Sequence, residues 1–196
     1  MGVDIGRMDE EYSLSELGEM GIEIVNVSAT FEIEGEFDRA SLHEDLPNTE
    51  YDPEKHRSLI YRGDAAMVLL PPSGRVSIVR ATTPDEIQAG VEEFISELRE
   101  LGIERNHSNI QIENVVGTAN LNQELDLSTV MVSLGFENAE YEPEQFPGVI
   151  YRIPDGAVVL IFSSGKIVIT KAETYDDVVN GYENTREVLQ TSEIRE

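Results

Sequence analysis

Two phenylalanines, Phe146 and Phe162, occupy positions in this sequence where core packing does not account for them. Phe146 lies in a Phe-Pro-Gly loop, where water should reach it, and Phe162 ends an apolar run directly before Ser-Ser-Gly-Lys. They are sixteen positions apart, on either side of a turn at Pro154-Asp155-Gly156. Such rings offer stacking and apolar contact, and a large exposed apolar patch usually marks an interaction site.

The segment that contains both rings, residues 141–170, occurs twice in the chain. Residues 51–79 repeat its order of Tyr-x-Pro-Glu, Tyr-Arg and Ser-Gly-basic, with Tyr51 and Tyr141 90 residues apart. Upstream, residues 22–27 match residues 110–115 at a spacing of 88. This period is too long for a solenoid unit. We therefore predict one supersecondary block that is duplicated into a pseudo-twofold structure.

Each copy is predicted to contain a strand, a short helix, three short strands and a long helix. In the first copy, alternation and turn residues place these elements at 22–33, 37–46, 59–62, 67–70, 76–79 and 83–101. The last of them opens on a predicted capping box, with Thr83 as N-cap, Pro84 at the first helical position and Glu86 completing the box. In the second copy, the elements fall at 110–121, 127–134, 149–152, 158–162, 167–170 and 174–189.

These elements predict an α+β fold in which the helices cover one face of an antiparallel sheet. The other face must then be solvated or carry a ligand. We divide the chain into an acidic, loose N-terminal tail over residues 1–20, a first repeat over 21–104 and a second repeat over 105–196. The connection at 103–109 is too short to separate independent domains, so the two repeats are expected to pack together.

The composition limits the class and the surroundings of the protein. A net charge of −25 would weaken the fold in dilute buffer through self-repulsion. At about 1 M salt the Debye length is about 3 Å, so the acidity indicates adaptation to a salt-rich cytoplasm, with an acidic mimic or decoy as the alternative. The absence of cysteine excludes disulfides and thiolate metal sites. No apolar stretch approaches the roughly 20 residues that span a bilayer, and no signal peptide opens the sequence.

An enzyme is the least favoured class of function. His43, His56 and His107 lack the spacing of metal ligands, no nucleophile stands beside a base, and no glycine-rich phosphate loop follows a strand. We expect no catalytic residue, no metal and no cofactor. The many carboxylates are more simply a solvated surface.

The uncovered face of the second repeat is predicted to be apolar, because Val116, Leu160 and Val168 stand where a solvated strand would show polar groups. The alternative is that these three residues belong to the core. Basic residues at equivalent positions of the two repeats suggest contacts with two phosphate backbones, with surface salt bridges as the alternative. The pairs are Arg62 with Arg152, Arg75 with Lys166, and Arg80 with Lys171.

Asn26 and Asn114 are also equivalent, and each lies in a strand rich in β-branched residues. Asparagine is a poor strand former, and its amide needs hydrogen-bonding partners on a sheet face. A symmetric pair near the twofold axis could donate to the acceptors of A·T pairs, which look alike in either orientation in the minor groove.

Together these motifs resemble the archaeal, halophilic type of the TATA-box-binding protein (TBP) family, over residues 22–189 and most specifically over 141–170. The resemblance implies a saddle, in which a curved antiparallel sheet has a DNA-binding underside and four helices on its convex face. It implies a general transcription initiation factor that binds A·T-rich promoter DNA in the minor groove and recruits transcription factor B and RNA polymerase.

The resemblance also implies roles for single residues. Phe146 and Phe162 correspond to the apolar wedges of minor-groove binding, and Asn26 and Asn114 to the central base-contacting asparagines. Glu142 and Glu144 lie in the loop that meets transcription factor B in the family. The floor that contacts DNA in the second repeat comprises Val116, Leu160, Val168 and Thr170.

The first repeat departs from this pattern. His56 and Pro71 stand where the second repeat has its phenylalanines. The positions of Val116, Val168 and Thr170 are occupied in the first repeat by Ser28, Ser77 and Val79. We therefore expect a bend on one side only and a relaxed sequence preference. The alternatives left open are a divergent paralogue that binds DNA weakly and regulates transcription through protein contacts, and self-association through the apolar face when DNA is absent.

Overall fold

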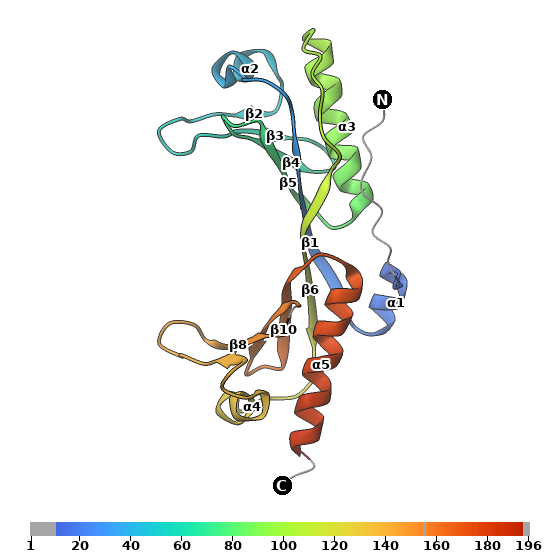
Figure 1. The fold of residues 1–196 in the computed structure, drawn as a ribbon, viewed down its shortest axis with the longest axis vertical. Helices are drawn as coiled ribbons and strands as arrows, with labels where there is room; N and C mark the ends of the chain where they lie inside the picture. Colours follow the sequence, from blue (N-terminus) through green and yellow to red (C-terminus); the bar gives the residue numbers. More distant parts are fainter. Residues whose placement is uncertain (1–10, 155, 194–196) are drawn as a thin grey trace. The chain divides into compact units, whose positions relative to one another are not determined.

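The structure, a computed structural model, describes residues 11–154 and 156–193, which form two compact units (Figure 1). Unit 1 is Asn26–Glu113, and unit 2 combines residues 11–25 with the described residues from Asn114 onward. The division between the units falls inside two long strands, β1 (Glu23–Glu32) and β6 (Gln111–Asn120). Asp155, in the predicted turn between the two phenylalanines, lies outside the described residues.

Unit 1 is an antiparallel sheet with the strand order β2-β3-β4-β5-β1. Its further strands are β2 (Thr49–Glu50), β3 (Leu59–Arg62), β4 (Met67–Leu70) and β5 (Arg75–Ala81). Helix α2 (Arg39–Asp45) follows β1, and the long helix α3 (Pro84–Glu100) follows β5 (Figure 1). The predicted elements of the first repeat are confirmed, and the two-residue strand β2 was not predicted.

Unit 2 repeats this plan with the strand order β6-β10-β9-β8-β7. Its further strands are β7 (Ala139–Glu140), β8 (Gly148–Arg152), β9 (Val158–Phe162) and β10 (Lys166–Ala172). Helix α4 (Leu127–Leu134) follows β6, and α5 (Tyr175–Glu193) follows β10 (Figure 1). The order of elements predicted for the second repeat is thus confirmed.

Alternate residues of each strand face the long helix of their unit. In unit 1 the rings of Tyr61 on β3 and Phe94 on α3 are 5.3 Å apart between centroids. In unit 2 the helix approaches so closely that a Cβ added to Gly117 on β6 would stand 2.5 Å from a methyl group of Val178 on α5. The residues that alternate with these helix-facing ones along each strand therefore point away from the helix.

The start of α3 shows how local sequence sets these elements. The Thr83 hydroxyl accepts a hydrogen bond from the Glu86 N–H at 3.1 Å, as an N-cap should. The Glu86 carboxylate, however, accepts from the N–H of Thr82 at 2.6 Å, one residue before the cap. The predicted capping box is therefore only half correct, since a box would return the Glu86 carboxylate to Thr83.

The expectation of a loose tail over residues 1–20 is wrong for its described end, because Leu14–Glu19 forms helix α1. Ser13 and Glu16 make a complete capping box there, which is the local signal that the acidic composition obscured. Leu17 is 1% exposed and fixes the helix to unit 2. Residues 1–10 lie outside the described part of the chain. Among the described residues, no helix combines the length and apolarity needed to span a membrane.

Replacing Leu17 with alanine should lower the free energy of unfolding by about 2–5 kcal/mol, because it removes the buried anchor of α1 and leaves a cavity. The measurement is urea unfolding in molar potassium chloride, followed by circular dichroism. Leu14→Ala is the matched control, since Leu14 lies on the same helix but is 44% exposed; it should change stability by less than about 0.5 kcal/mol. Equal effects of the two variants would show that α1 does not dock.

Candidate nucleic-acid interface

The helix-free face of unit 2 is apolar, as predicted. A row of paired residues crosses it from β6 to β8, namely Thr118, Val168, Leu160 and Ile150. Each of these side chains is half-buried, whereas their neighbours Val159, Ile161, Ile167 and Ile169 are fully buried on the helix side. Val116 is likewise half-buried between the buried residues Val115 and Gly117. These positions are accordingly not part of the core beneath the helix.

Phe146 and Phe162 meet on this face. Their ring centroids are 5.7 Å apart with an interplanar angle of 59°, a tilted pair of the kind that aromatic rings favour. Phe162 on β9 pairs with Gly148 on β8. A Cβ on Gly148 would stand 3.0 Å from the Phe146 ring and 3.2 Å from the Phe162 ring. The absence of a side chain at position 148 therefore gives the ring pair its space, a role that the sequence alone did not reveal.

The same place in unit 1 has no aromatic pair, in agreement with the sequence comparison. His56 turns back onto its own loop, where its Nδ1 lies 2.9 Å from the carbonyl oxygen of Ser58. Pro71 is half-buried. The row across this face is Thr30, Ser77, Leu69 and Ile60, so Ser77 occupies the position that Val168 holds in unit 2.

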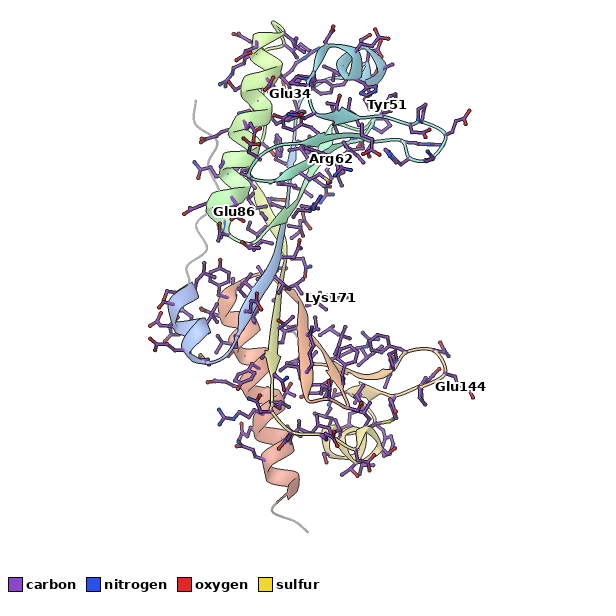
Figure 2. The ribbon with its side chains drawn as sticks, turned by 180° about the vertical axis from the view of Figure 1, so that it is seen from behind. Glu34, Tyr51, Arg62, Glu86, Glu144 and Lys171 are labelled. Carbon is purple, nitrogen blue, oxygen red and sulfur yellow. The ribbon has the colours of Figure 1, made fainter. Side chains whose placement is uncertain are left out.

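Three of the six basic residues predicted to contact phosphates, Arg62, Arg75 and Arg152, are paired with carboxylates. Arg62, which is labelled in Figure 2, lies 2.7 Å from Glu50 in unit 1. The equivalent Arg152 lies 3.3 Å from Glu140 in unit 2. All four side chains are about half exposed. Exposed pairs of this kind contribute only about 0–1 kcal/mol, so another anion can replace the carboxylate at little cost.

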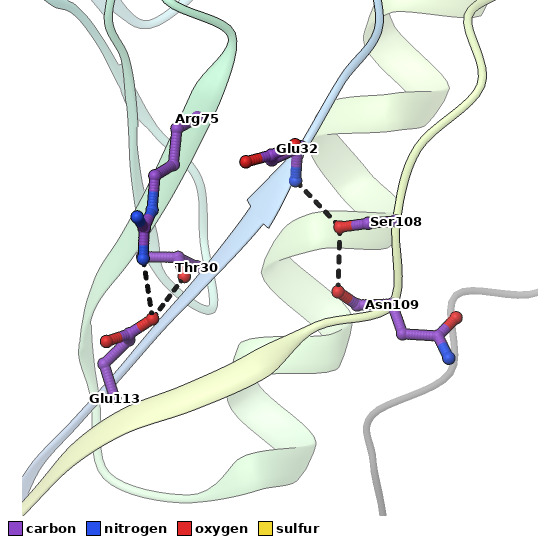
Figure 3. Close-up of polar contacts among 6 residues, drawn as sticks. All are labelled: Thr30, Glu32, Arg75, Ser108, Asn109 and Glu113. Carbon is purple, nitrogen blue, oxygen red and sulfur yellow. Dashed lines mark hydrogen bonds and ion pairs between the residues drawn. The ribbon is translucent and has the colours of Figure 1, made fainter.

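Arg75 takes part in a larger network on the helix-free face of unit 1 (Figure 3). Its guanidinium donates to the Glu113 carboxylate at 3.1 Å, and the Thr30 hydroxyl donates to the same oxygen at 2.7 Å. The bond from Thr30, assisted by Arg75, lowers the pKa of Glu113 below its ordinary value. Lys166, the equivalent of Arg75, forms no ion pair with any carboxylate in the described part of the chain.

The segment before β6 positions Glu113. The Glu32 N–H donates to the Ser108 hydroxyl at 2.9 Å, and that hydroxyl donates to the Asn109 carbonyl oxygen at 3.0 Å (Figure 3). His107 packs edge-on against Phe31 with 6.3 Å between ring centroids. The end of β1 thus holds the chain just upstream of Glu113. Sequence reasoning missed Glu113, because its partners are 38 and 83 residues away.

Asn114 is half-buried on β6, and its side-chain oxygen accepts a hydrogen bond from the Lys171 N–H at 2.8 Å. Lys171 has a φ of 57° within an irregularity of the β6–β10 pairing, and Arg80 has a φ of 67° at the equivalent place in β5. Thr170 and Asn26 are half-buried too. The side-chain amide of Asn114 therefore stabilises a bulge. The sequence predicted that this amide needs a hydrogen-bonding partner, and the partner is the backbone N–H of Lys171.

The loop before β8 carries the two glutamates predicted to bind a partner protein. The N–H groups of Gln145 and Phe146 both donate to the Glu142 carbonyl oxygen at 2.9 Å. The side-chain amide of Gln145 also donates to the Glu142 carboxylate. Glu142 and Glu144 are exposed, and Glu144 lies at the far end of the loop (Figure 2). One short loop therefore directs carboxylates outward and Phe146 onto the sheet.

Comparison with known proteins identifies the family. Residues 21–101 and residues 109–192 each match the family described as "Transcription factor TFIID (or TATA-binding protein, TBP)". The chain belongs to the TATA-binding protein family. The two matched stretches lie within the repeats 21–104 and 105–196 that the sequence suggested.

Individual TBPs agree with this assignment. The chain is 37% identical to TATA-box-binding protein D of Halobacterium salinarum, over 86% of this chain and 92% of that protein. It is 39% identical to the TATA-box-binding protein of Natronomonas pharaonis, over 80% and 86%. The solved structure of Methanococcus jannaschii TBP superposes with a TM-score of 0.73 at 35% identity, over 87% of this chain and 98% of that one.

These matches confirm the archaeal, halophilic type and the α+β fold class that the sequence predicted. They also place the chain among transcription factors of general initiation rather than among enzymes. Helix α1 is an addition to the four helices that the resemblance implied.

Proposed function

We propose that this TBP acts in transcription initiation by binding A·T-rich promoter DNA in the minor groove through the helix-free faces of its units. The observation that carries the proposal is the Phe146–Phe162 pair, which stands on the apolar, helix-free face of unit 2. Minor-groove binders insert apolar side chains of this kind between base steps and kink the duplex. No helix packs against the face on which this half-buried pair lies, so packing within unit 2 does not account for the two rings.

The surrounding residues support this mode of binding. Val116, Leu160, Val168 and Thr170 would form the floor against the base edges, with Asn26 and Asn114 reading the degenerate acceptors of A·T pairs. Arg62, Arg75, Arg152 and Lys166 would contact phosphates, where they position the duplex without reading its sequence.

The test is a fluorescence anisotropy titration in molar potassium chloride with two duplexes of equal length, one A·T-rich and one G·C-rich. We expect saturable binding of the first and at least about tenfold weaker binding of the second, since each mismatched base pair in a site typically costs about 1–3 kcal/mol. Equal affinities, or no binding of either duplex, would refute the proposal. Sedimentation of the free protein would show whether self-association covers the apolar face.

Recruitment of transcription factor B and RNA polymerase is the second part of the proposal. Glu142 and Glu144 are exposed at a loop that is braced by its own hydrogen bonds, so their charges are available to a basic partner surface. Replacing both with lysine should weaken binding of transcription factor B to the protein–DNA complex by about tenfold or more, because like charges would face each other.

Biolayer interferometry with immobilised duplex measures this effect. Duplex binding itself should stay unchanged in the double variant. Glu54→Lys is the matched control, because Glu54 is the exposed equivalent of Glu144 in the loop of unit 1. A loss of transcription factor B with Glu54→Lys instead would move the contact to unit 1.

The missing aromatic pair of unit 1 favours one alternative function. With His56 bonded to Ser58 and Pro71 in place of a ring, unit 1 offers no wedge at this position. A paralogue of this kind could bind duplex weakly and regulate transcription through protein contacts. Binding of transcription factor B without DNA, at an affinity that added duplex does not raise, would favour this alternative.

A further inference from the structure

The floors of the two units differ in hydrogen-bonding capacity at equivalent positions. Unit 2 has the hydrocarbon side chains Val116 and Val168 where unit 1 has the hydroxyls of Ser28 and Ser77. It also has Val25 where unit 1 has the Glu113 carboxylate. At these three positions the unit 1 floor thus presents hydrogen-bond acceptors where unit 2 has hydrocarbon. Leu69 and Leu160 are hydrocarbon in both units. The difference is reversed only where unit 2 has Thr170 and unit 1 has Val79, and there the Thr170 hydroxyl donates to Asn114 Oδ1 at 3.4 Å.

In the minor groove, A·T and T·A pairs present only acceptors, and a G·C pair adds one donor, the N2 amine of guanine. A hydrocarbon floor leaves that amine without a partner once water is expelled, which costs free energy. A floor with hydroxyl or carboxylate oxygens accepts from it instead. The difference between the two floors is therefore a difference in tolerance for guanine.

We propose that the two units read different base pairs, with unit 2 confined to A·T and unit 1 accepting G·C through Ser77 and Glu113. This inference rests on the proposed DNA binding and goes beyond it, because it assigns a composition to each half of the site. The recognised duplex then has an A·T-rich half and a half in which guanine is accepted.

The network around Glu113 suits this role. The Thr30 hydroxyl and the Arg75 guanidinium both donate to one carboxylate oxygen, Oε1, at 2.7 Å and 3.1 Å. An ionised carboxylate accepts at two oxygens with about four lone-pair sites, so Oε2 keeps capacity for an incoming amine. Arg75 is 59% exposed, so it can offset the carboxylate's charge or turn toward a phosphate.

The experiment uses three duplexes of equal length in molar potassium chloride. The A·T duplex has A·T pairs in both halves, the mixed duplex has A·T in one half and G·C in the other, and the G·C duplex has G·C in both. The protein can bind the mixed duplex in the orientation that places unit 2 on the A·T half. We expect the mixed duplex to bind within about threefold of the A·T duplex, and the G·C duplex about tenfold or more weakly. A fourth, mixed duplex with inosine·cytosine for G·C lacks only the N2 amine and should bind no more tightly than its guanine counterpart.

Two independent variants test the residues. Ser77→Val and Glu113→Val each install the residue type of unit 2 and should lower the affinity for the mixed duplex by about tenfold relative to the A·T duplex. The ratio of the two affinities is the readout, because Glu113→Val also releases Arg75, whose contact with a phosphate would affect both duplexes alike. Glu100→Val removes the same charge from the end of α3, on the helix side of unit 1, and should change neither affinity. Thermal melting of each variant identifies any loss of folding, and Ser77→Val retains the test should Glu113→Val not fold.

The outcomes separate this inference from the proposed function. If the A·T duplex binds but the mixed duplex binds as weakly as the G·C duplex, the two units do not read different base pairs, and the proposal of DNA binding stands. If inosine improves the mixed duplex, the amine is an obstruction and the inference is also wrong. If the A·T duplex itself fails to bind, both proposals are refuted.

Discussion

Replacing Phe162 with alanine should weaken binding of an A·T-rich duplex by about 5- to 150-fold, the range that corresponds to about 1–3 kcal/mol for one aromatic–base stacking contact. Replacing Phe146 with alanine should have a similar effect on affinity, because the two rings are 5.7 Å apart and act as a pair. The double variant should therefore lose less than the sum of the two single losses in binding free energy.

The matched controls are His56→Ala and Pro71→Ala, the equivalent positions of unit 1. They should change affinity by less than about twofold, since His56 is already bonded within its own loop and neither position presents an aromatic ring. A larger loss in these controls would mean that unit 1 inserts side chains into the duplex after all.

The same variants make a prediction about DNA shape. Unstacking costs a few kcal/mol per base step, and we expect this cost at one end of the site only. Energy transfer between dyes placed at either end and at the centre of the duplex should locate a single kink on one side. Phe162→Ala should abolish it. Two equal kinks in the wild-type complex would contradict the proposal that unit 2 alone carries the wedge.

The elements of the fold could be predicted because their signals are local. Strand alternation, turn residues and the Thr83 cap recur in the same order in both repeats, so each copy supports the interpretation of the other. Helix α1 was missed although its capping box is also local, because Ser13 and Glu16 lie within an acidic segment that has no repeated counterpart. The two-residue strands β2 and β7 are too short to have a period.

The candidate site was predicted in part. The face of Val116, Leu160 and Val168 followed from alternation, and it proved correct. The Arg62–Glu50 and Arg152–Glu140 pairs could have been found, since both span twelve residues at equivalent places in the two repeats.

Long-range contacts could not be found in this way. The bonds of Glu113 to Thr30 and of Asn114 to Lys171 join residues 83 and 57 positions apart, a separation that no local sequence pattern spans. The space that Gly148 leaves for the two rings depends on the register of β8 with β9, which no local pattern specifies.

Affinity for A·T-rich duplex should stay constant or rise as potassium chloride increases through the molar range. An ordinary protein with 6–10 phosphate contacts loses about 10³–10⁵ in affinity between 50 and 200 mM salt, because binding releases counterions from the DNA. In this chain Arg62, Arg75 and Arg152 are already paired with Glu50, Glu113 and Glu140. Phosphates would displace those carboxylates and leave them beside the DNA, so cations must be taken up to compensate.

Glu50 and Glu140 are the residues expected to set this salt dependence. Glu50→Gln combined with Glu140→Gln frees Arg62 and Arg152 without changing their positions. The slope of log affinity against log salt should then become more negative by about 0.9 for each phosphate contact that no longer requires cation uptake. Glu92→Gln and Glu100→Gln, on the exposed face of α3, remove the same charge away from the interface and should leave the slope unchanged. A steep fall of wild-type affinity with salt would show that the carboxylates do not act at the interface. An unchanged slope in the double variant would show that Glu50 and Glu140 are not the residues that bind the cations.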